Sequence, residues 1–106
     1  MARRWTVKDV LQAALSRLQV YGWVQWDTGN RKVGYCMTGA IYASTRNGSL
    51  RLGAIDALNA AVTKRDPHLL EGVTFPATRV QCFNDQDRRR KSTIISIYHQ
   101  AIKGSR

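Results

Sequence analysis

The chain has few acidic residues and no long apolar run. Seven Asp and Glu stand against 17 Lys and Arg in 106 residues, so the formal net charge is +10. No apolar stretch approaches the roughly 18 residues that a membrane-spanning helix needs. Asp9 and Gln12 also interrupt the apolar stretch that a secretory signal behind Arg3 and Arg4 would require. These absences exclude a transmembrane helix and predict a cytoplasmic protein without a membrane partner.

Cysteine and histidine are scarce as well. The chain holds two cysteines, Cys36 and Cys82, with no Cys-x-x-Cys pair, and two histidines, His68 and His99, far apart in sequence. Cysteines in a chain without a secretory signal are expected to be reduced. A structural zinc site needs a set of Cys and His ligands at close spacing. The sequence therefore predicts reduced thiols, no metal and no cofactor.

The apolar content is sufficient for one ordinary core. Apolar residues make up 43% of the chain, which excludes wholesale disorder. A length of 106 residues is far below the roughly 250 at which chains usually divide into domains. There is no internal repeat, low-complexity tract or linker. We expect a single small basic domain over residues 1–106, with its core in approximately residues 6–103.

The first predicted helix has the clearest signals. Thr6 is a good N-cap residue, and the carboxylate of Asp9, three positions later, can reach back to the cap amide. Gly22 is well placed to end the helix in the left-handed conformation. The apolar positions follow helical spacing, and they are Val7, Val10, Leu11, Ala14, Leu15 and Leu18. This pattern predicts a core helix.

A short β-hairpin is predicted after this helix. The residues Asp27-Thr28-Gly29-Asn30 supply turn chemistry between two alternating segments. The alternation places four residues on the inner face of the hairpin, namely Val24, Trp26, Val33 and Tyr35. A lone hairpin is marginal in water, so it must pack against helices.

Small residues mark a second helix that starts near Cys36. Gly39, Ala40 and Ala43 would allow close approach of a neighbour, which would offset the cost of about 1 kcal/mol for a glycine inside a helix. A third helix is expected from a Ser49 cap to Asp66-Pro67, with an apolar stripe at Leu52, Ile55, Leu58, Ala61 and Val62. The aperiodic stretch 67–76 follows, where Leu69, Leu70, Val73 and Phe75 can dock on the core.

The last helix is expected to open at Phe83-Asn84-Asp85. Asn84 or Asp85 is a fitting N-cap, and Gly104 closes the helix. Its apolar stripe comprises Ile94, Ile95, Tyr98, Ala101 and Ile102. The predicted fold class is therefore α+β and mainly helical, with three to four helices packed around one short β-hairpin.

Three short segments resemble a known pattern. They are Gly22-Trp23, Tyr35-Cys36-Met37-Thr38-Gly39-Ala40-Ile41, and Phe83-Asn84-Asp85 before a final helix. The pattern is similar to an uncharacterised family of small actinobacterial and actinobacteriophage domains, with Gly-Trp, Cys-x-x-Gly-Ala and aromatic-Asn-Asp segments. The resemblance extends over nearly the whole chain, from about Val10 to Ala101, and implies a stand-alone, phage-encoded domain without an established activity. Members tend to be less basic after Asn-Asp than this chain is.

The most unusual charged feature is the run Arg88-Arg89-Arg90-Lys91. Guanidinium groups beside the free amides of a helix N-terminus form an anion site, and Arg31, Lys32, Arg3 and Arg4 add to the candidate nucleic-acid or anion-binding residues. The alternative is a solvated face in which Asp85 and Asp87 neutralise part of the run. Each alternative has about equal support from the way basic clusters usually act.

The aromatic residues near these bases offer a second candidate surface. Trp5 follows Arg3 and Arg4, while Trp23 and Trp26 precede the hairpin turn. Stacking of a nucleobase on such rings is worth about 1–3 kcal/mol per base. The stronger alternative is that a tryptophan in a small hairpin anchors the core.

Cys36 carries the only enzymatic hypothesis. A cysteine at a helix N-terminus has a stabilised thiolate, and His68 or His99 would have to serve as its base. A buried free cysteine that packs beside Gly39 and Ala40 is the common explanation. We therefore interpret Cys36, Gly39, Ala40, Asn84 and Asp85 as a structural motif, with no catalytic residues.

The sequence reveals no reaction. The favoured function is a non-catalytic binding protein for an anionic partner, with nucleic acid favoured and bound through its phosphates, because no known base-reading motif is present. The alternative is a phage accessory protein that binds and modulates an acidic host protein. A Cys36-dependent enzyme is a distant third possibility.

Overall fold

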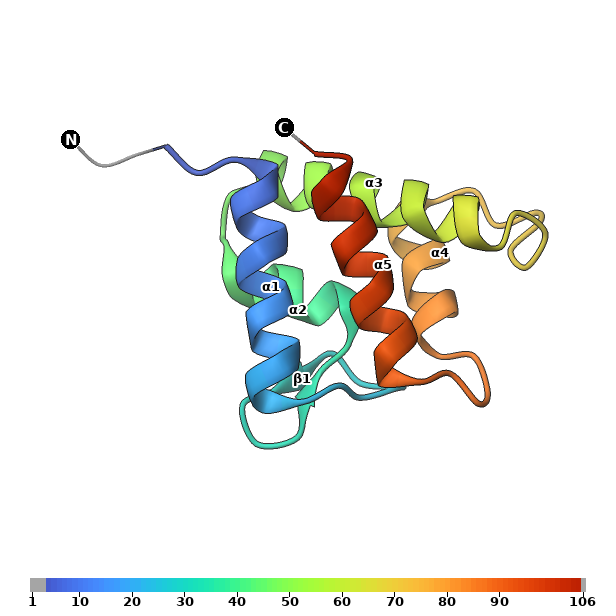
Figure 1. The fold of residues 1–106 in the computed structure, drawn as a ribbon, viewed down its shortest axis with the longest axis horizontal. Helices are drawn as coiled ribbons and strands as arrows, with labels where there is room; N and C mark the ends of the chain where they lie inside the picture. Colours follow the sequence, from blue (N-terminus) through green and yellow to red (C-terminus); the bar gives the residue numbers. More distant parts are fainter. Residues whose placement is uncertain (1–3, 106) are drawn as a thin grey trace.

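The computed structural model describes residues 4–105. This stretch contains five helices and one two-stranded antiparallel sheet (Figure 1). In chain order they are α1 (Val7–Tyr21), β1 (Gly29–Asn30), β2 (Gly34–Tyr35), α2 (Met37–Ser44), α3 (Gly48–Arg65), α4 (Pro76–Asn84) and α5 (Lys91–Lys103). The predicted α+β, mainly helical class is confirmed, with one helix more than the three to four expected. No helix among the described residues is long and apolar enough to cross a membrane.

Helix α1 forms as its local signals predict. Thr6 and Asp9 make a capping box, in which Thr6 N donates to Asp9 Oδ2 at 2.8 Å and Asp9 N donates to Thr6 Oγ1 at 3.2 Å. Gly22 ends the helix with φ 103° and ψ 174°, which is an extended positive-φ conformation and not a left-handed helical one. The buried face comprises Val10, Leu11, Ala14, Leu15 and Leu18.

The hairpin is shorter than predicted and has a different register. Gly29 pairs with Tyr35 and Asn30 pairs with Gly34, so the turn falls at residues 31–33 and not at 27–30. A Cβ atom on Gly29 would collide with the Gly34 carbonyl oxygen. Only glycine permits the two strands to come this close at Gly29. This close approach sets the pairing register of β1 and β2, and the alternation of apolar residues does not.

Two residues that were placed on the inner face of the hairpin are in fact exposed. Trp26 is 77% exposed and Val33 is 52% exposed, whereas Tyr35 is buried as expected. The partly buried tryptophan is Trp23, which forms an isolated bridge with Tyr35. The core-anchor interpretation is therefore correct for Trp23 and wrong for Trp26.

Helix α2 begins after Cys36, as predicted. The Cys36 sulfur accepts a hydrogen bond from Gly39 N at 3.2 Å and so caps the helix. A Cβ atom on Gly39 would collide with the carbonyl oxygen of Thr28, which confirms the expected close approach. Ala40 is fully buried, but Ala43 is exposed and takes no part in this contact.

Helix α3 starts two residues earlier than predicted. Asn47, and not Ser49, is its N-cap, with Asn47 Oδ1 accepting from Leu50 N at 2.9 Å. The helix ends at Asp66, as expected. Leu52 and Phe75, which were expected in the core, are 67% and 75% exposed.

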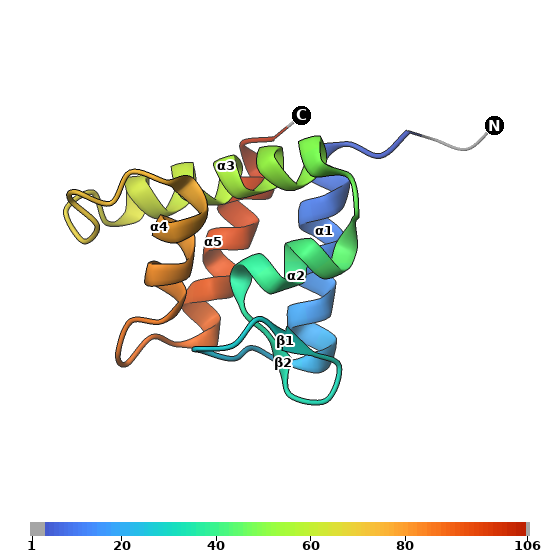
Figure 2. The same cartoon turned by 180° about the vertical axis from the view of Figure 1, so that it is seen from behind.

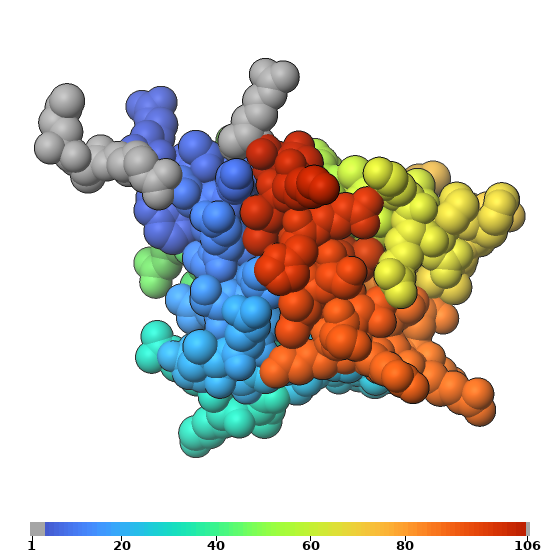
Figure 3. All heavy atoms as spheres, in the orientation of Figure 1, coloured from blue at the N-terminus to red at the C-terminus, as the bar shows by residue number. Residues whose placement is uncertain are grey.

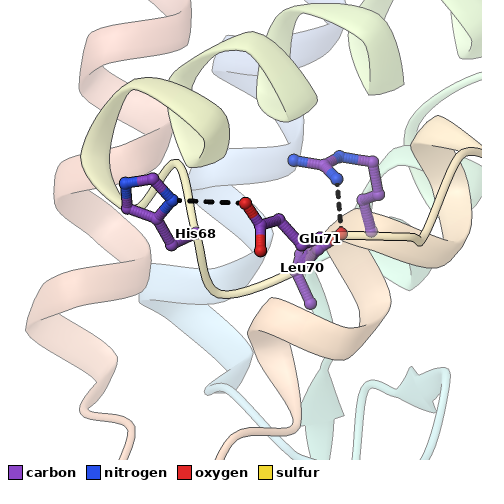
Figure 4. A network of polar contacts seen from close by, with 4 residues as sticks. His68, Leu70 and Glu71 are labelled. Carbon is purple, nitrogen blue, oxygen red and sulfur yellow. Dashed lines mark hydrogen bonds and ion pairs between the residues drawn. The ribbon is translucent and has the colours of Figure 1, made fainter.

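The loop between α3 and α4 is held by Arg79. Its Nη1 donates to the carbonyl oxygens of Leu70 and Val73, both at 2.9 Å, while Nε donates to Asn59 Oδ1 and Nη2 to Thr63 Oγ1. Figure 4 shows the Leu70 carbonyl and the neighbouring contact of His68 with Glu71. One guanidinium group thus ties the loop to α3.

The largest correction concerns Asn84 and Asp85. They lie at the C-terminal end of α4 and do not cap the last helix, which begins at Lys91 with Arg90 as an N-cap that makes no side-chain hydrogen bond. Pro76 at the first position of α4 is a recognised helix-start signal. Helix α4 therefore forms in a region where no separate helix was expected, and Asn84 is its last residue.

Helix α5 packs against α1 and α3, and in Figure 1 it runs beside α1. Its buried residues are Ile94, Ile97, Tyr98 and Ala101. The hydroxyl group of Tyr98 donates to the Met37 carbonyl oxygen at 2.6 Å. Complete burial, with a smaller contribution from Cys36, raises the pKa of Tyr98 well above its usual value. Tyr98 therefore joins α5 to the start of α2 as a neutral phenol.

Candidate functional site

The buried side chain of Asn84 uses all of its hydrogen-bonding groups. Its oxygen accepts from Trp23 Nε1 at 2.7 Å and from Met37 N at 3.0 Å. Its nitrogen donates to the Val24 carbonyl oxygen at 3.0 Å and to Asp85 Oδ1 at 2.9 Å. An amide offers two donor and two acceptor positions, and all four are occupied. Asn84 thus joins the Gly-Trp segment, the start of α2 and the end of α4.

Asp85 continues this network toward the surface. It is 8% exposed, and its Oδ1 accepts from Trp26 N at 2.8 Å as well as from Asn84. Its Oδ2 accepts from Gln81 Nε2 at 2.9 Å. A buried carboxylate is tolerated when hydrogen bonds replace its lost solvation. Asp85 therefore holds the backbone of Trp26 in a fixed position.

Trp26 has an unusual backbone and an unusual exposure. It has φ 62°, and within residues 4–105 Arg88 is the other non-glycine residue with positive φ. Left-handed backbone at a bulky residue costs about 1–3 kcal/mol and persists only where the surrounding structure enforces it. Here the Asp85 hydrogen bond enforces it, while the indole remains 77% exposed. Such a residue is a candidate for function.

Gln25 connects the Trp26 segment to the loop between α4 and α5. Its Nε2 donates to the carbonyl oxygens of Asn84 at 3.0 Å and Gln86 at 2.7 Å. The segment that carries Trp26 is therefore attached to the loop that carries Arg88.

The predicted anion-binding residues are only partly brought together. The hairpin turn carries Arg31 and Lys32, and the loop before α5 carries Arg88 and Arg90; all four are exposed. Both segments lie at the lower end of the molecule in Figure 1, and in Figure 3 they project from its two lower corners. The segment between α1 and β1, which contains Trp26, runs along the same lower edge (Figure 1).

The remaining candidates are divided between the two ends of the molecule. Lys91 is exposed and begins α5 at the lower end, but Arg4 precedes α1 at the upper end. Arg3 falls outside the described residues. The exposed residues at the lower end form the candidate site, which we name the basic edge: Trp26, Arg31, Lys32, Arg88, Arg90 and Lys91.

Arg89 differs from its neighbours in the basic run. Its guanidinium carbon lies 3.7 Å from the centre of the Phe83 ring, and its Nε donates to the Phe83 carbonyl oxygen at 3.0 Å. Partial burial, and then repulsion from Arg65, lowers the pKa of Arg89 from its usual value. Arg89 therefore anchors the loop to α4, whereas Arg88 and Arg90 are exposed.

Among the described residues, no ion pair within 4 Å joins an acidic side chain to the exposed basic side chains of the basic edge. The ion pair found among residues 4–105 joins His68 Nδ1 and Glu71 Oε1 at 3.5 Å, at a distance from the basic edge. Within these residues, neither Asp85 nor Asp87 pairs with Arg88 or Arg90, although the sequence had suggested such neutralisation. These basic side chains are thus exposed and have no ion-paired acid within the described part of the chain.

Cys36 is enclosed and lacks a nearby base in the described structure. Its sulfur is fully buried and makes hydrogen-bond contacts with Gly39 N, Thr38 Oγ1 and Gln81 Oε1. His68 is exposed in the loop between α3 and α4, and His99 lines a separate hollow between α3 and α5. These contacts give Cys36 a role in capping and packing.

A hollow of about 390 Å³ opens beside the Asp85 network, between α2 and α4. These two helices lie on the side seen in Figure 2, above the segment that contains Trp26. The residues that give the hollow its chemistry are Trp26, Thr38, Tyr42, Gln81, Cys82 and Asp85. Its described lining includes no lysine or arginine, so Asp85 is its charged group.

One protein-family model covers nearly the whole chain. The model of the Family of unknown function (DUF6197) matches residues 2–104. The chain belongs to DUF6197. No curated protein and no solved structure matches it. Membership of a family of unknown function, which the resemblance implied, is therefore confirmed.

The sequence analysis did not identify two glutamines of the candidate site, Gln25 and Gln81. Gln81 lies four residues before Asp85 on one face of a helix, a spacing that signals a side-chain pair once α4 is recognised. Gln25 donates hydrogen bonds to residues about 60 positions away in the chain, and no local sequence pattern predicts such a contact.

Proposed function

We propose that this DUF6197 chain is a non-catalytic binding protein for single-stranded nucleic acid. The observation that carries the proposal is Trp26, whose strained backbone is held by Asp85 while its indole stays in solvent between two basic segments. Trp26 would stack on an unpaired base. Arg31, Lys32, Arg88, Arg90 and Lys91 would contact the phosphates.

Physical chemistry supports this combination. An exposed indole forgoes the roughly 1.5–3 kcal/mol that burial of a large apolar side chain gains, so a fold that enforces its exposure keeps it available to a partner. Aromatic platforms beside positive charge are typical of proteins that bind single strands. A single strand is favoured over a duplex because bases in a duplex are already stacked on one another.

A basic edge would also suit an acidic protein. We place the chain in the cytoplasm, as an actinobacterial or phage-encoded domain, where an acidic host protein is the alternative partner. The exposed Trp26 favours nucleic acid, because stacking on bases uses the aromatic ring as well as the charge.

The test measures binding of fluorescent 12-nucleotide single strands by anisotropy at several salt concentrations. Five phosphate contacts predict a slope of log affinity against log salt of about −3.5. The triple variant R88A/R90A/K91A is expected to reduce the magnitude of the slope by about 2. W26A should weaken binding about tenfold and leave the slope unchanged.

The matched control removes the same charge at the other end of the molecule. Lys8 lies at the start of α1 and Lys103 at the end of α5, both at the upper end in Figure 1, and Lys64 lines the hollow between α3 and α5. K8A/K64A/K103A should keep most of the salt dependence. An equal loss in both triple variants would contradict a role for the basic edge, and undetectable binding at about 50 mM salt would refute the proposed function.

A further inference from the structure

The hollow between α2 and α4 has a different chemistry from the basic edge. It is lined by two aromatic residues, Trp26 and Tyr42, and by the polar side chains of Thr38, Gln81 and Asp85. Its volume of about 390 Å³ falls within the range of small-molecule sites, roughly 300–1,000 Å³. Because its charged group is a carboxylate, the hollow repels phosphate and admits a neutral, planar group that donates hydrogen bonds.

The hydrogen bonds of Asp85 leave one acceptor position open. A carboxylate has about four acceptor positions. Oδ1 accepts two hydrogen bonds, from Trp26 N and Asn84 Nδ2, and among the described residues Oδ2 accepts one, from Gln81 Nε2. The open position is therefore on Oδ2, beside Gln81.

Gln81 supplies a donor next to this acceptor. Its Oε1 accepts from Thr38 Oγ1 at 2.9 Å and contacts the Cys36 sulfur at 3.4 Å, which fixes the orientation of the amide. Its Nε2 carries two hydrogens and donates one of them to Asp85 Oδ2. The pair therefore presents one acceptor and one donor side by side.

We propose that this hollow binds one nucleobase that carries an amino group beside an unprotonated ring nitrogen, as in cytosine and adenine. The amino group would donate to Asp85 Oδ2, and Gln81 Nε2 would donate to the ring nitrogen. Acidic side chains are known acceptors for the amino group of cytosine, and bases of single strands are commonly read at this edge. This inference rests on the proposed function and adds base preference to it.

Uracil and guanine present the opposite pattern at the same edge. Each carries a carbonyl oxygen beside a ring N–H, so the carbonyl would face the Asp85 carboxylate. Cytosine and uracil have the same ring and are the best matched pair for a test. A correct pair of hydrogen bonds predicts about tenfold tighter binding of oligo(C) than of oligo(U).

The first experiment compares eight-nucleotide oligo(C) and oligo(U) by anisotropy. Wild type is expected to prefer oligo(C) about tenfold. Thr78 lies on the lining and is exposed, so T78W should fill the hollow without disturbing the core. T78W should bind both strands as wild type binds oligo(U), whereas the control T74W, in the exposed loop before α4, should keep the preference.

The outcomes separate the two proposals. Equal affinity of wild type for the two strands would overturn the base pocket and leave the proposed function intact. Failure to bind either strand would refute the proposed function. A preference for oligo(C) that survives in T78W would place base reading outside the hollow and would overturn the inference.

Cys82 provides a readout that does not depend on strand binding. It lines the hollow and is half-buried, whereas Cys36 is fully buried. Cytidine monophosphate is expected to slow labelling of the Cys82 thiol by a maleimide at least threefold, and uridine monophosphate should leave the rate unchanged. Equal labelling rates with the two nucleotides would contradict the pocket. D85N, assayed after a thermal melt confirms folding, should abolish the protection by cytidine monophosphate.

Discussion

Replacing Asn84 with alanine removes four hydrogen bonds at once. It leaves two donors unpaired, Trp23 Nε1 and Met37 N, and also removes the partner of the Val24 carbonyl oxygen and of Asp85 Oδ1. A buried donor without a partner costs about 1–3 kcal/mol. The two donors alone therefore predict a loss of about 4 kcal/mol in the free energy of unfolding. This is a large share of the roughly 5–15 kcal/mol of a typical domain.

Urea denaturation followed by circular dichroism measures this loss. With a slope of about 1.5 kcal/mol per molar urea, the midpoint of N84A should fall by about 2–3 M. Asn59→Ala is the matched control, since the Asn59 side chain makes one hydrogen bond among the described residues, with Arg79, and the substitution should cost about 1–2 kcal/mol.

A double-mutant cycle with Trp23→Phe isolates one bond of the network. Phenylalanine keeps an aromatic ring but lacks the donor that reaches Asn84, so the two substitutions should couple by more than about 0.5 kcal/mol. If N84A cost no more than N59A, or if the cycle showed no coupling, the view of Asn84 as the junction of three segments would be refuted.

Two further predictions concern the loop between α3 and α4 and the core phenol. Arg79→Met should lower stability by about 2–4 kcal/mol and expose residues 66–75 to limited proteolysis; a loop that stays resistant would argue against the role of Arg79. The pKa of Tyr98 is raised by burial, so its neutral form stabilises the fold below about pH 10 and this contribution is lost as pH rises further. Tyr98→Phe should therefore lose less stability above pH 10 than wild type does, as measured by urea midpoints across that range; parallel curves would contradict it.

Local signals in the sequence were sufficient for α1 and most of α5. A capping box at Thr6 and Asp9 and a stripe of apolar residues act within a few turns of one helix, so they are readable without tertiary information. The start of α2 at Cys36 was predictable for the same reason.

The functional site was less predictable because its contacts cross the chain. Asn84 and Asp85 have good N-cap side chains, and that local preference suggested the wrong helix end. Their actual partners, Trp23 and Trp26, lie about 60 residues earlier. Hydrogen bonds of this range leave no periodic trace in a sequence.

In the basic run of four consecutive residues, too, the sequence predicts one property and the tertiary structure decides another. Composition and order identify Arg88, Arg89 and Arg90 as an excess of positive charge, and nothing in the sequence separates them. Packing on Phe83 partly buries Arg89, while Arg88 and Arg90 are exposed.

The amino-acid sequence by itself determined the helical class, the strongest helix boundaries and the positive charge, because these follow from spacing and composition. Only the tertiary structure decided which tryptophan is buried and which is presented to solvent. That choice depends on glycine backbones that cross at Gly29, Gly34 and Gly39 and on one carboxylate, Asp85, that reaches Trp26. Such contacts are set by close packing between distant segments, and they exist only when the whole chain is folded.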